Sequence, residues 1–323
     1  MPHHTRLVNN RSYTAFLPID DELDLKPHKN YLFDLSWLGC LDLTGAASQD
    51  FLQGQLSCDL KKVTSSQMRS GALCNLKGRL LALLDVIDWH GLHLILPCDL
   101  LLKTQNTLNK TAVFSKVKLN QAQDYQIFGL YLQNSDNIVP FNAHLTHERY
   151  SVISTDTYCA YHLGLGFYIF IISKSHVDDV CSHFIKEEQM RGSLSWHALR
   201  LRQHHIEIYP ESRGLFLPHR VGLHLSGYLS FDKGCYKGQE IIARTHYRAK
   251  LKHEMKLFMI STTEPLKSGQ RLFSPDNHKE LGELIDFCPF DQSSYLIAVS
   301  MIFDHPMECR IEEHKTCVRL RLQ

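Results

Sequence analysis

The sequence lacks three features that would assign it to a class at once: an excess of charge of one sign, a long hydrophobic run and paired cysteines. The 35 Lys and Arg residues balance 34 Asp and Glu residues, so the net charge is +1 and no bulk field attracts nucleic acid or an anionic membrane. No apolar run approaches the roughly 20 residues that span a bilayer, and the first residues contain no signal-peptide core. We therefore expect a cytoplasmic protein without a membrane partner, and direct binding of nucleic acid is disfavoured.

The ten cysteines and twenty histidines follow no metal or redox pattern. Neither Cys-x-x-Cys nor His-Glu-x-x-His occurs, so the sequence predicts no metal site, and most cysteines are expected to be small buried residues. The phosphate-binding loop of nucleotide-driven enzymes and the Gly-x-Ser-x-Gly motif of serine hydrolases are also missing. These absences disfavour nucleotide-driven chemistry and serine hydrolysis.

Hydrophobic residues make up 44% of the 323 positions, which is enough for a large core divided into about two domains. Residues 1–30 are expected to be a loosely structured lead-in, and the chain from 251 to 323 to be a small β domain. Apolar runs at 80–87 and 92–96 predict an antiparallel hairpin, and alternation predicts a strand at 112–119. Helical spacing occurs at 99–110, 177–186 and 194–203, so the fold class is α+β.

The most informative stretch runs from Phe231 to Glu240 and contains the sequence Lys-Gly-Cys-Tyr-Lys-Gly-Gln-Glu. Two glycines bracket Cys235, and the positive charges of Lys233 and Lys237 favour its thiolate, which is typical of a reactive-thiol loop. The alternative is a tight turn that opens a helix, with the cysteine merely packed and Glu240 complementing the helix dipole. Residue chemistry alone leaves both interpretations open.

A row of basic residues follows this stretch at alternate positions, which predicts a β-strand with its charges on one face. Such a face suits a multiply anionic ligand, such as a polyglutamate tail or a phosphate backbone, or it protects an exposed sheet edge. The row comprises Arg244, His246, Arg248, Lys250 and Lys252.

The segment Lys233–Glu240 resembles the signature of the YgfZ family, a group of folate-binding proteins related to the T protein of the glycine cleavage system. Four further stretches agree with the family in the same order along the chain. They are Leu43–Ala46 with Gln53–Gln55 and Asp59, Cys74–Arg79, Ala112–Val117 and Phe216–His219.

The resemblance implies a three-domain ring of α+β architecture with a central channel for tetrahydrofolate. The domains would be a folate-binding region of two subdomains at 31–250 and a small C-terminal β-barrel at 251–323. It also implies an accessory role in the assembly or repair of iron–sulfur clusters in client enzymes, with an indirect effect on tRNA thiomethylation. The functional residues carried over are the thiol of Cys235 with Lys233, and for the cofactor Asn75, Tyr236, Gly238, Gln239, Glu240, Arg244 and Arg248.

Two departures from the related aminomethyltransferases bear on this expectation. The positions of the aspartate pair of those enzymes fall on Ala82 and Leu83, which cannot relay a proton, so aminomethyl transfer is disfavoured. The carboxylate expected to hold the pterin is replaced around Arg202, which leaves Glu207 or Glu240 to pair with the pterin edge. A nonenzymatic scaffold that senses folate remains the alternative function. Direct tRNA binding through the basic row is the weakest of the functional hypotheses.

Overall fold

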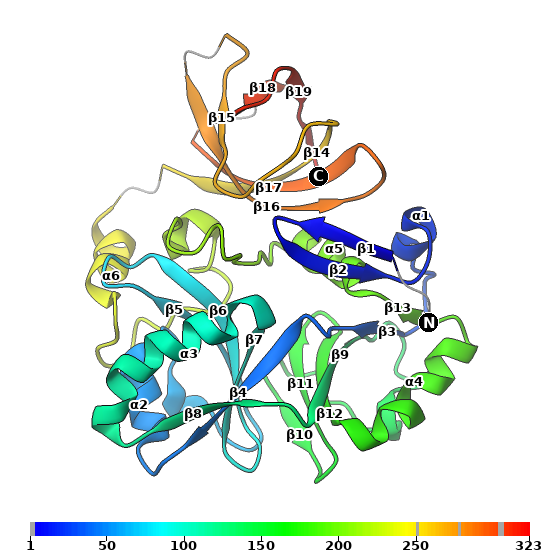
Figure 1. Ribbon diagram of the computed structural model, residues 1–323, viewed down its shortest axis with the longest axis vertical. Helices are drawn as coiled ribbons and strands as arrows, with labels where there is room; N and C mark the ends of the chain where they lie inside the picture. The colour runs from blue at the N-terminus through cyan, green and yellow to red at the C-terminus, as the bar shows by residue number, and fades with distance from the viewer. Residues whose placement is uncertain (1–3, 250–251, 277–278, 303–306) are drawn as a thin grey trace.

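The computed structural model describes residues 4–249, 252–276, 279–302 and 307–323, and it arranges two sheet-and-helix units and a C-terminal barrel around a common centre (Figure 1). The first unit is built on a five-stranded antiparallel sheet in the order β5-β6-β7-β4-β8. These strands are β4 (Leu38–Thr44), β5 (Arg69–Cys74), β6 (Leu80–Asp88), β7 (Leu92–Pro97) and β8 (Lys118–Ala122). The helices α2 (Ser48–Gln55) and α3 (Cys98–Ala112) cover it.

The first unit confirms the predicted hairpin and corrects the predicted strand at 112–119. Strands β6 and β7 pair antiparallel, and the helix expected at 99–110 is α3. The helix continues to Ala112, a 3-10 turn follows at Val113–Ser115, and β8 begins only at Lys118. Val113 and Phe114 are 68% and 85% exposed, so the alternation of apolar residues there does not mark a buried strand face.

The second unit is a six-stranded sheet in the order β10-β11-β12-β9-β3-β13. Its strands are β3 (Tyr31–Asp34), β9 (Tyr125–Tyr131), β10 (Val152–Ser154), β11 (Tyr158–Gly164), β12 (Phe167–Ser173) and β13 (Met190–Arg191). The helices predicted at 177–186 and 194–203 are α4 (Val177–Lys186) and α5 (Ser193–Arg202). Trp196 of α5 packs on Gly129 so closely that a Cβ there would lie 2.5 Å from the indole.

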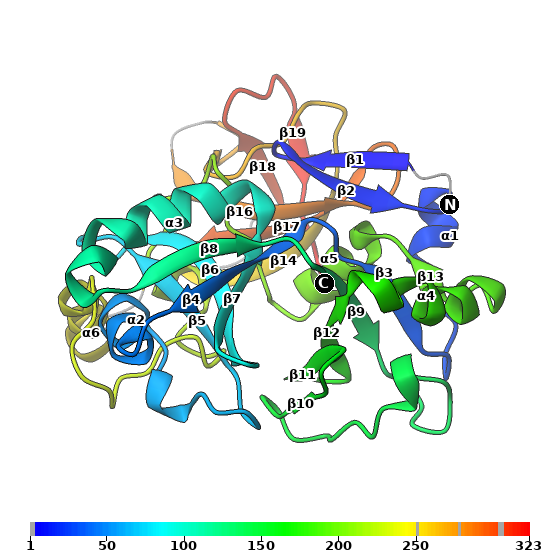
Figure 2. The same ribbon diagram turned by 60° about the horizontal axis from the view of Figure 1, so that its bottom comes forward.

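The C-terminal part is a nearly closed seven-stranded antiparallel barrel in the order β19-β18-β15-β16-β17-β14-β20. This confirms the expected barrel fold; the position of the boundary stays a prediction, and Lys250 and Leu251 beside it lie outside the described residues. The strands are β14 (Glu254–Ser261), β15 (Arg271–Phe273), β16 (Glu280–Pro289), β17 (Ser294–Met301), β18 (Glu308–Ile311), β19 (Cys317–Arg319) and β20 (Arg321–Leu322). Figure 2 shows the two other sheets on either side of the centre, with α5 and barrel strands behind them.

The N-terminal segment differs from the loosely structured lead-in expected at 1–30. Strands β1 (His4–Val8) and β2 (Arg11–Ala15) form a hairpin, which helix α1 (Ile19–Leu23) follows. Tyr13 is fully buried, and the side chains of Asn9 and Ser268 hydrogen-bond at 3.0 Å, which ties the hairpin turn to the barrel. The sequence does not predict this hairpin, because the buried face of β2 is short and acidic and proline residues follow it at 18–27.

The buried side chain of Arg11 on β2 is the centre of an ion cluster whose carboxylates are partly exposed. Its guanidinium donates two hydrogen bonds of 2.9 Å to the Asp99 carboxylate at the start of α3 and pairs with Glu207 at 3.2 Å. It also donates to the carbonyl of Ile208 at 2.7 Å. The cluster therefore joins the hairpin, the first unit and the segment that follows α5.

In the described part of the chain, no helix is both long and apolar enough to cross a membrane.

We expect Arg11→Met to lower the free energy of unfolding by about 1.5–3 kcal/mol, because it removes the charged donor of the hydrogen bonds to Asp99, Glu207 and the Ile208 carbonyl. Urea unfolding measures the loss. Arg6→Met, at an exposed position of β1, is the matched control and should stay within about 0.5 kcal/mol of the wild type. A loss below about 1 kcal/mol for the Arg11 variant would contradict a central role for the cluster.

Candidate functional site

A cavity of about 850 Å³ lies between the six-stranded sheet, the segment that follows α5 and the start of the barrel. Strand β11 contributes Leu163 and Gly164, and the barrel contributes Glu254 and Met255 at the start of β14. A cavity of this size at the junction of several units is typical of a small-molecule site. Its imidazole and guanidinium groups come from His147, Arg149, His162, Arg200, His204, His205, His219, His224 and His253.

The two arginines are held in place by contacts with the cavity wall. Arg149 donates to the carbonyl of Ser226 at 2.7 Å, and its guanidinium lies 4.5 Å from the centroid of the Tyr150 ring. The Arg200 guanidinium lies 5.2 Å from the Phe167 ring, and burial lowers its pKa. Among the described lining residues Glu254 is the acidic one, so the cavity favours an anionic ligand.

Several imidazoles of the wall are held neutral. Burial lowers the pKa of His205 to about 2 and that of His219 to about 4, and it also lowers the pKa of His162 and His224. His162 donates from Nδ1 to the carbonyl of Glu148, so its buried Nε2 is an acceptor without a partner. Both ring nitrogens of His219 and Nδ1 of His224 also lack partners. The wall therefore offers unsatisfied polar atoms to a ligand.

A second, narrow cavity of about 60 Å³, here called the extension, adjoins the first, with which it shares the lining residues Leu163 and Arg200. Glu207 and Asp85 bring carboxyl groups to it. Burial raises the pKa of Glu207 to about 7, although Arg11 opposes this. Asp85 accepts hydrogen bonds from Ser70 at 2.6 Å and from the Tyr161 hydroxyl at 3.0 Å.

Neither Asp85 nor the histidines that line the cavity were predicted from the sequence. An acidic residue inside the apolar run at 80–87 was the available signal for Asp85. The histidines come from separate segments of the chain, so no spacing groups them.

Lys233 of the signature segment lies away from the cavity, at the end of α2. It is 8% exposed, and its ammonium group donates three hydrogen bonds of 2.7–2.8 Å to the carbonyls of Gln53, Leu56 and Cys58. Burial lowers its pKa to about 8. The ring of Tyr236 lies 5.0 Å from the same group. Lys233 thus binds one carbonyl of the last turn of α2 and two carbonyls of the segment that follows the helix.

Gly238 begins helix α6 (Gln239–Arg248) with a backbone conformation that suits glycine, at φ +83°. A Cβ there would lie 2.4 Å from the carbonyl oxygen of Asn75, so only glycine allows α6 to approach the turn between β5 and β6. Asn75 shapes that turn, because its side-chain oxygen accepts hydrogen bonds from the backbone of Lys77 and Arg79 at 2.9 and 3.0 Å.

Known proteins resemble the chain in sequence and in fold, although no family model matches it. A tRNA-modifying protein YgfZ from Colwellia psychrerythraea is 23% identical, covering 85% of the chain and 86% of the relative. Proteins of the same name from Klebsiella pneumoniae and Hamiltonella defensa are 28% and 29% identical; the first comparison covers 80% and 81% of the two chains, and the second 65% and 64%. The chain is thus similar to proteins of the YgfZ family over most of its length.

The fold matches a solved structure almost throughout. The crystal structure of glycine cleavage system aminomethyltransferase T from Bartonella henselae superposes with a TM-score of 0.75 over 99% of this chain and 92% of the other, at 13% sequence identity. The chain therefore has the fold of this aminomethyltransferase, as the resemblance implied.

The basic row that follows the YgfZ signature is not a strand. Arg244, His246 and Arg248 lie on α6, with Arg244 and Arg248 exposed. The glycine at its N-cap and Glu240 in its first turn start a helix, which places alternate residues on different faces. Lys250 lies outside the described residues, and His246 stacks on Phe231 with ring centroids 3.8 Å apart.

The predicted YgfZ-family site residues do not meet at the cavity. None of the nine lines it, as far as the described residues show: Asn75, Lys233, Cys235, Tyr236, Gly238, Gln239, Glu240, Arg244 and Arg248. They gather instead around α6 and the end of α2, where Cys235 is exposed. Of the two carboxylates considered for the pterin, Glu207 reaches the extension, whereas Glu240 is an exposed residue of α6.

The two positions compared with the aminomethyltransferase aspartates lie on β6. Ala82 is fully buried, and Leu83 lines the narrow extension with an apolar side chain. Asp85, two residues further along, is the carboxylate that this strand presents there.

We expect Lys233→Met to lower the free energy of unfolding by roughly 2–3 kcal/mol, because three buried carbonyls lose a charged donor. Urea unfolding, followed by circular dichroism, measures the change. Lys237→Met in the same segment is the control and should change stability by less than about 0.5 kcal/mol. Equal effects of the two substitutions would argue against a structural role specific to Lys233.

Proposed function

We propose that this protein binds tetrahydrofolate in the central cavity and supports tRNA modification indirectly, as an accessory factor for iron–sulfur enzymes. Its curated relatives are named tRNA-modifying proteins, which supports the link to tRNA modification. The balanced charge, with a net value of +1, supports an indirect link, because a general tRNA-binding protein needs a strongly basic surface. The iron–sulfur role follows from the resemblance of the signature segment.

The observation that carries the folate proposal is a cationic cavity that adjoins an extension lined by a carboxylate. Folate joins a flat pterin, whose edge carries two N–H donors, to a tail with carboxylates. Glu207 supplies the paired acceptors that such an edge needs, and Arg149, an exposed residue of the cavity lining, supplies the cation for the tail. The extension of about 60 Å³ is too small for the ring, so the pterin lies in the wide part and turns its donor edge toward Glu207.

Calorimetric titration with tetrahydrofolate under reducing conditions tests this binding mode. We expect saturable one-to-one binding and at least tenfold weaker binding by Glu207→Gln, because a carboxamide provides one acceptor and one mismatched donor. Since burial raises the pKa of Glu207 to about 7, its ionised fraction, and with it the affinity, should rise about tenfold between pH 6 and pH 8.

Two results would contradict the mode. Glu240→Gln is the matched control and should bind as the wild type does, so an equal loss in both variants would exclude a specific role of Glu207. A Glu207→Gln variant that keeps the full rise of affinity with pH would assign that rise to another group. Thermal unfolding of each variant separates lost binding from lost folding, because Glu207 also pairs with Arg11.

Cys235 is proposed to carry the accessory activity through its thiol. In cells that lack the endogenous gene, we expect Cys235→Ser to reduce thiomethylated nucleosides in tRNA at least tenfold, measured by mass spectrometry, while tetrahydrofolate binding is retained. Cys317→Ser changes another exposed thiol and should have no effect. Full activity of the Cys235 variant would instead favour a nonenzymatic scaffold that senses folate.

A further inference from the structure

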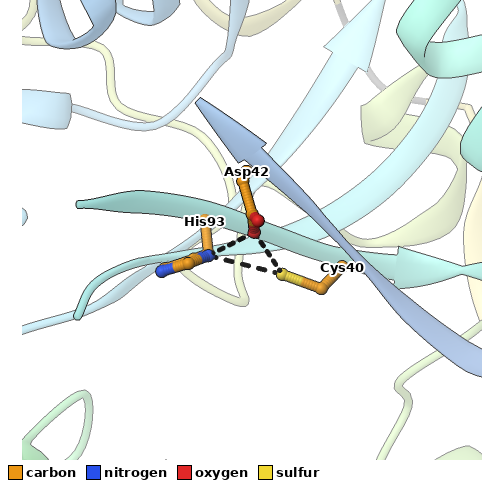
Figure 3. Close-up of side chains that lie close together, drawn as sticks. All are labelled: Cys40, Asp42 and His93. Atoms are coloured by element: carbon orange, nitrogen blue, oxygen red, sulfur yellow. Dashed lines mark hydrogen bonds and ion pairs between the residues drawn. The ribbon is translucent and has the colours of Figure 1, made fainter. Parts of the chain in front are cut away.

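Three side chains of different chemistry converge on the five-stranded sheet, away from the residues that line the central cavity (Figure 3). Cys40 and Asp42 alternate on β4 and share one face, and His93 on β7 is the register partner of Asp42. The Cys40 Sγ lies 3.5 Å from His93 Nδ1 and 3.4 Å from Asp42 Oδ1, and these two atoms are 2.7 Å apart. A thiol, an imidazole nitrogen and a carboxylate oxygen thus face one point.

The other nitrogen of His93 fixes the ring in this orientation. Its Nε2 lies 2.7 Å from the carbonyl oxygen of Trp89, which can only accept, so Nε2 carries a proton and donates. The other nitrogen, Nδ1, lies 2.7 Å from the Asp42 oxygen. A ring nitrogen without a proton and a carboxylate oxygen both carry lone pairs, so a cation must lie between them at this distance. That cation is either a proton or a metal ion. A histidine held by a carbonyl through its second nitrogen is the usual arrangement of a metal ligand.

The spacing of the donor atoms fits a small tetrahedral ion. Ordinary zinc–ligand bonds separate a sulfur from a nitrogen or oxygen ligand by about 3.5 Å, and a nitrogen from an oxygen ligand by about 3.3 Å. Both distances from Cys40 agree, and the His93–Asp42 pair must open by roughly 0.6 Å to reach the zinc spacing. The Asp42 side chain is 34% exposed and has room for this shift. Sulfur and imidazole ligands favour zinc over the hard cations calcium and magnesium.

A route to the site exists from solvent. Cys40 is 4% exposed, and its side chain lines a surface cavity of about 450 Å³ together with Cys98, Tyr125 and Lys174. Three protein ligands leave the fourth position of a tetrahedral ion free for a water or another small ligand. Binding of the ion at Cys40 releases the thiol proton, as structural zinc does at other thiolate sites.

We propose that Cys40, Asp42 and His93 form a zinc site whose fourth coordination position is open. The proposal is independent of the folate site, and it revises the prediction of no metal site. Sequence patterns do not reveal it, because two ligands lie on one strand and the third is 51 positions further along the chain.

Cobalt substitution provides a direct test on the full-length protein after removal of metal by a chelator. We expect Co²⁺ to produce a thiolate charge-transfer band in the near ultraviolet and intense visible bands of tetrahedral cobalt, and Zn²⁺ to remove both. Cys40→Ser should abolish the charge-transfer band and weaken zinc binding at least tenfold in competition titrations. Cys98→Ser, which changes a thiol of the same cavity outside the cluster, should keep both.

A second measurement uses only the wild-type protein, so that it does not depend on the folding of a variant. Zinc should slow the alkylation of Cys40 at least tenfold, as mapped by mass spectrometry of peptides, and leave Cys98 and Cys235 unprotected. An unchanged cobalt spectrum in Cys40→Ser, absence of the charge-transfer band in the wild type, or alkylation of Cys40 at the same rate with and without zinc would each overturn the proposal.

Discussion

A buried guanidinium joins the parts of this protein. Arg11 of the N-terminal hairpin pairs with Asp99 at the start of α3 and with Glu207 after α5, and the backbone N–H of Glu207 donates to Asp286 of the barrel strand β16 at 2.8 Å. The Arg11 guanidinium thus links the hairpin to the first unit by an ion pair, and to the barrel through Glu207 and its hydrogen bond to Asp286. Because an unpaired charge in such a site costs several kcal/mol, the cluster is stable only when each contributing segment is in place.

The same cluster connects the assembly of the fold with the central cavity. Glu207 uses one carboxylate oxygen for Arg11 and also lines the narrow extension, so a ligand that bonds to this carboxylate touches the ion cluster directly. Any ligand that binds only the folded state stabilises it. A ligand at Glu207 would stabilise in addition the junction between the units, since it fixes the residue through which they are joined.

Local sequence patterns predicted the helices and strands whose burial is periodic. They failed where helix capping or contacts between distant segments determine the structure. The hairpin β6–β7 and the helices α3, α4 and α5 follow from their apolar spacing. The basic row after the signature has a period of two, yet Gly238 at the N-cap and Glu240 in the first turn start a helix over it. The cavity could not be predicted, because its histidines belong to segments that only the folded chain brings together. The N-terminal hairpin was missed because the buried face of β2 is short and one of its three buried residues is the charged Arg11.

The geometry of the signature separates its buried residues Lys233 and Tyr236 from its exposed cysteine. Lys233 binds three carbonyls at the end of α2, Tyr236 is buried beside it, and Gly238 allows close approach of α6 to Asn75. Each of these residues has a structural task that accounts for its type. Cys235 is exposed on the same turn, and no hydrogen bond of its side chain occurs among those of the described residues. An exposed thiol on this turn is accessible to a partner, as the role proposed for Cys235 requires.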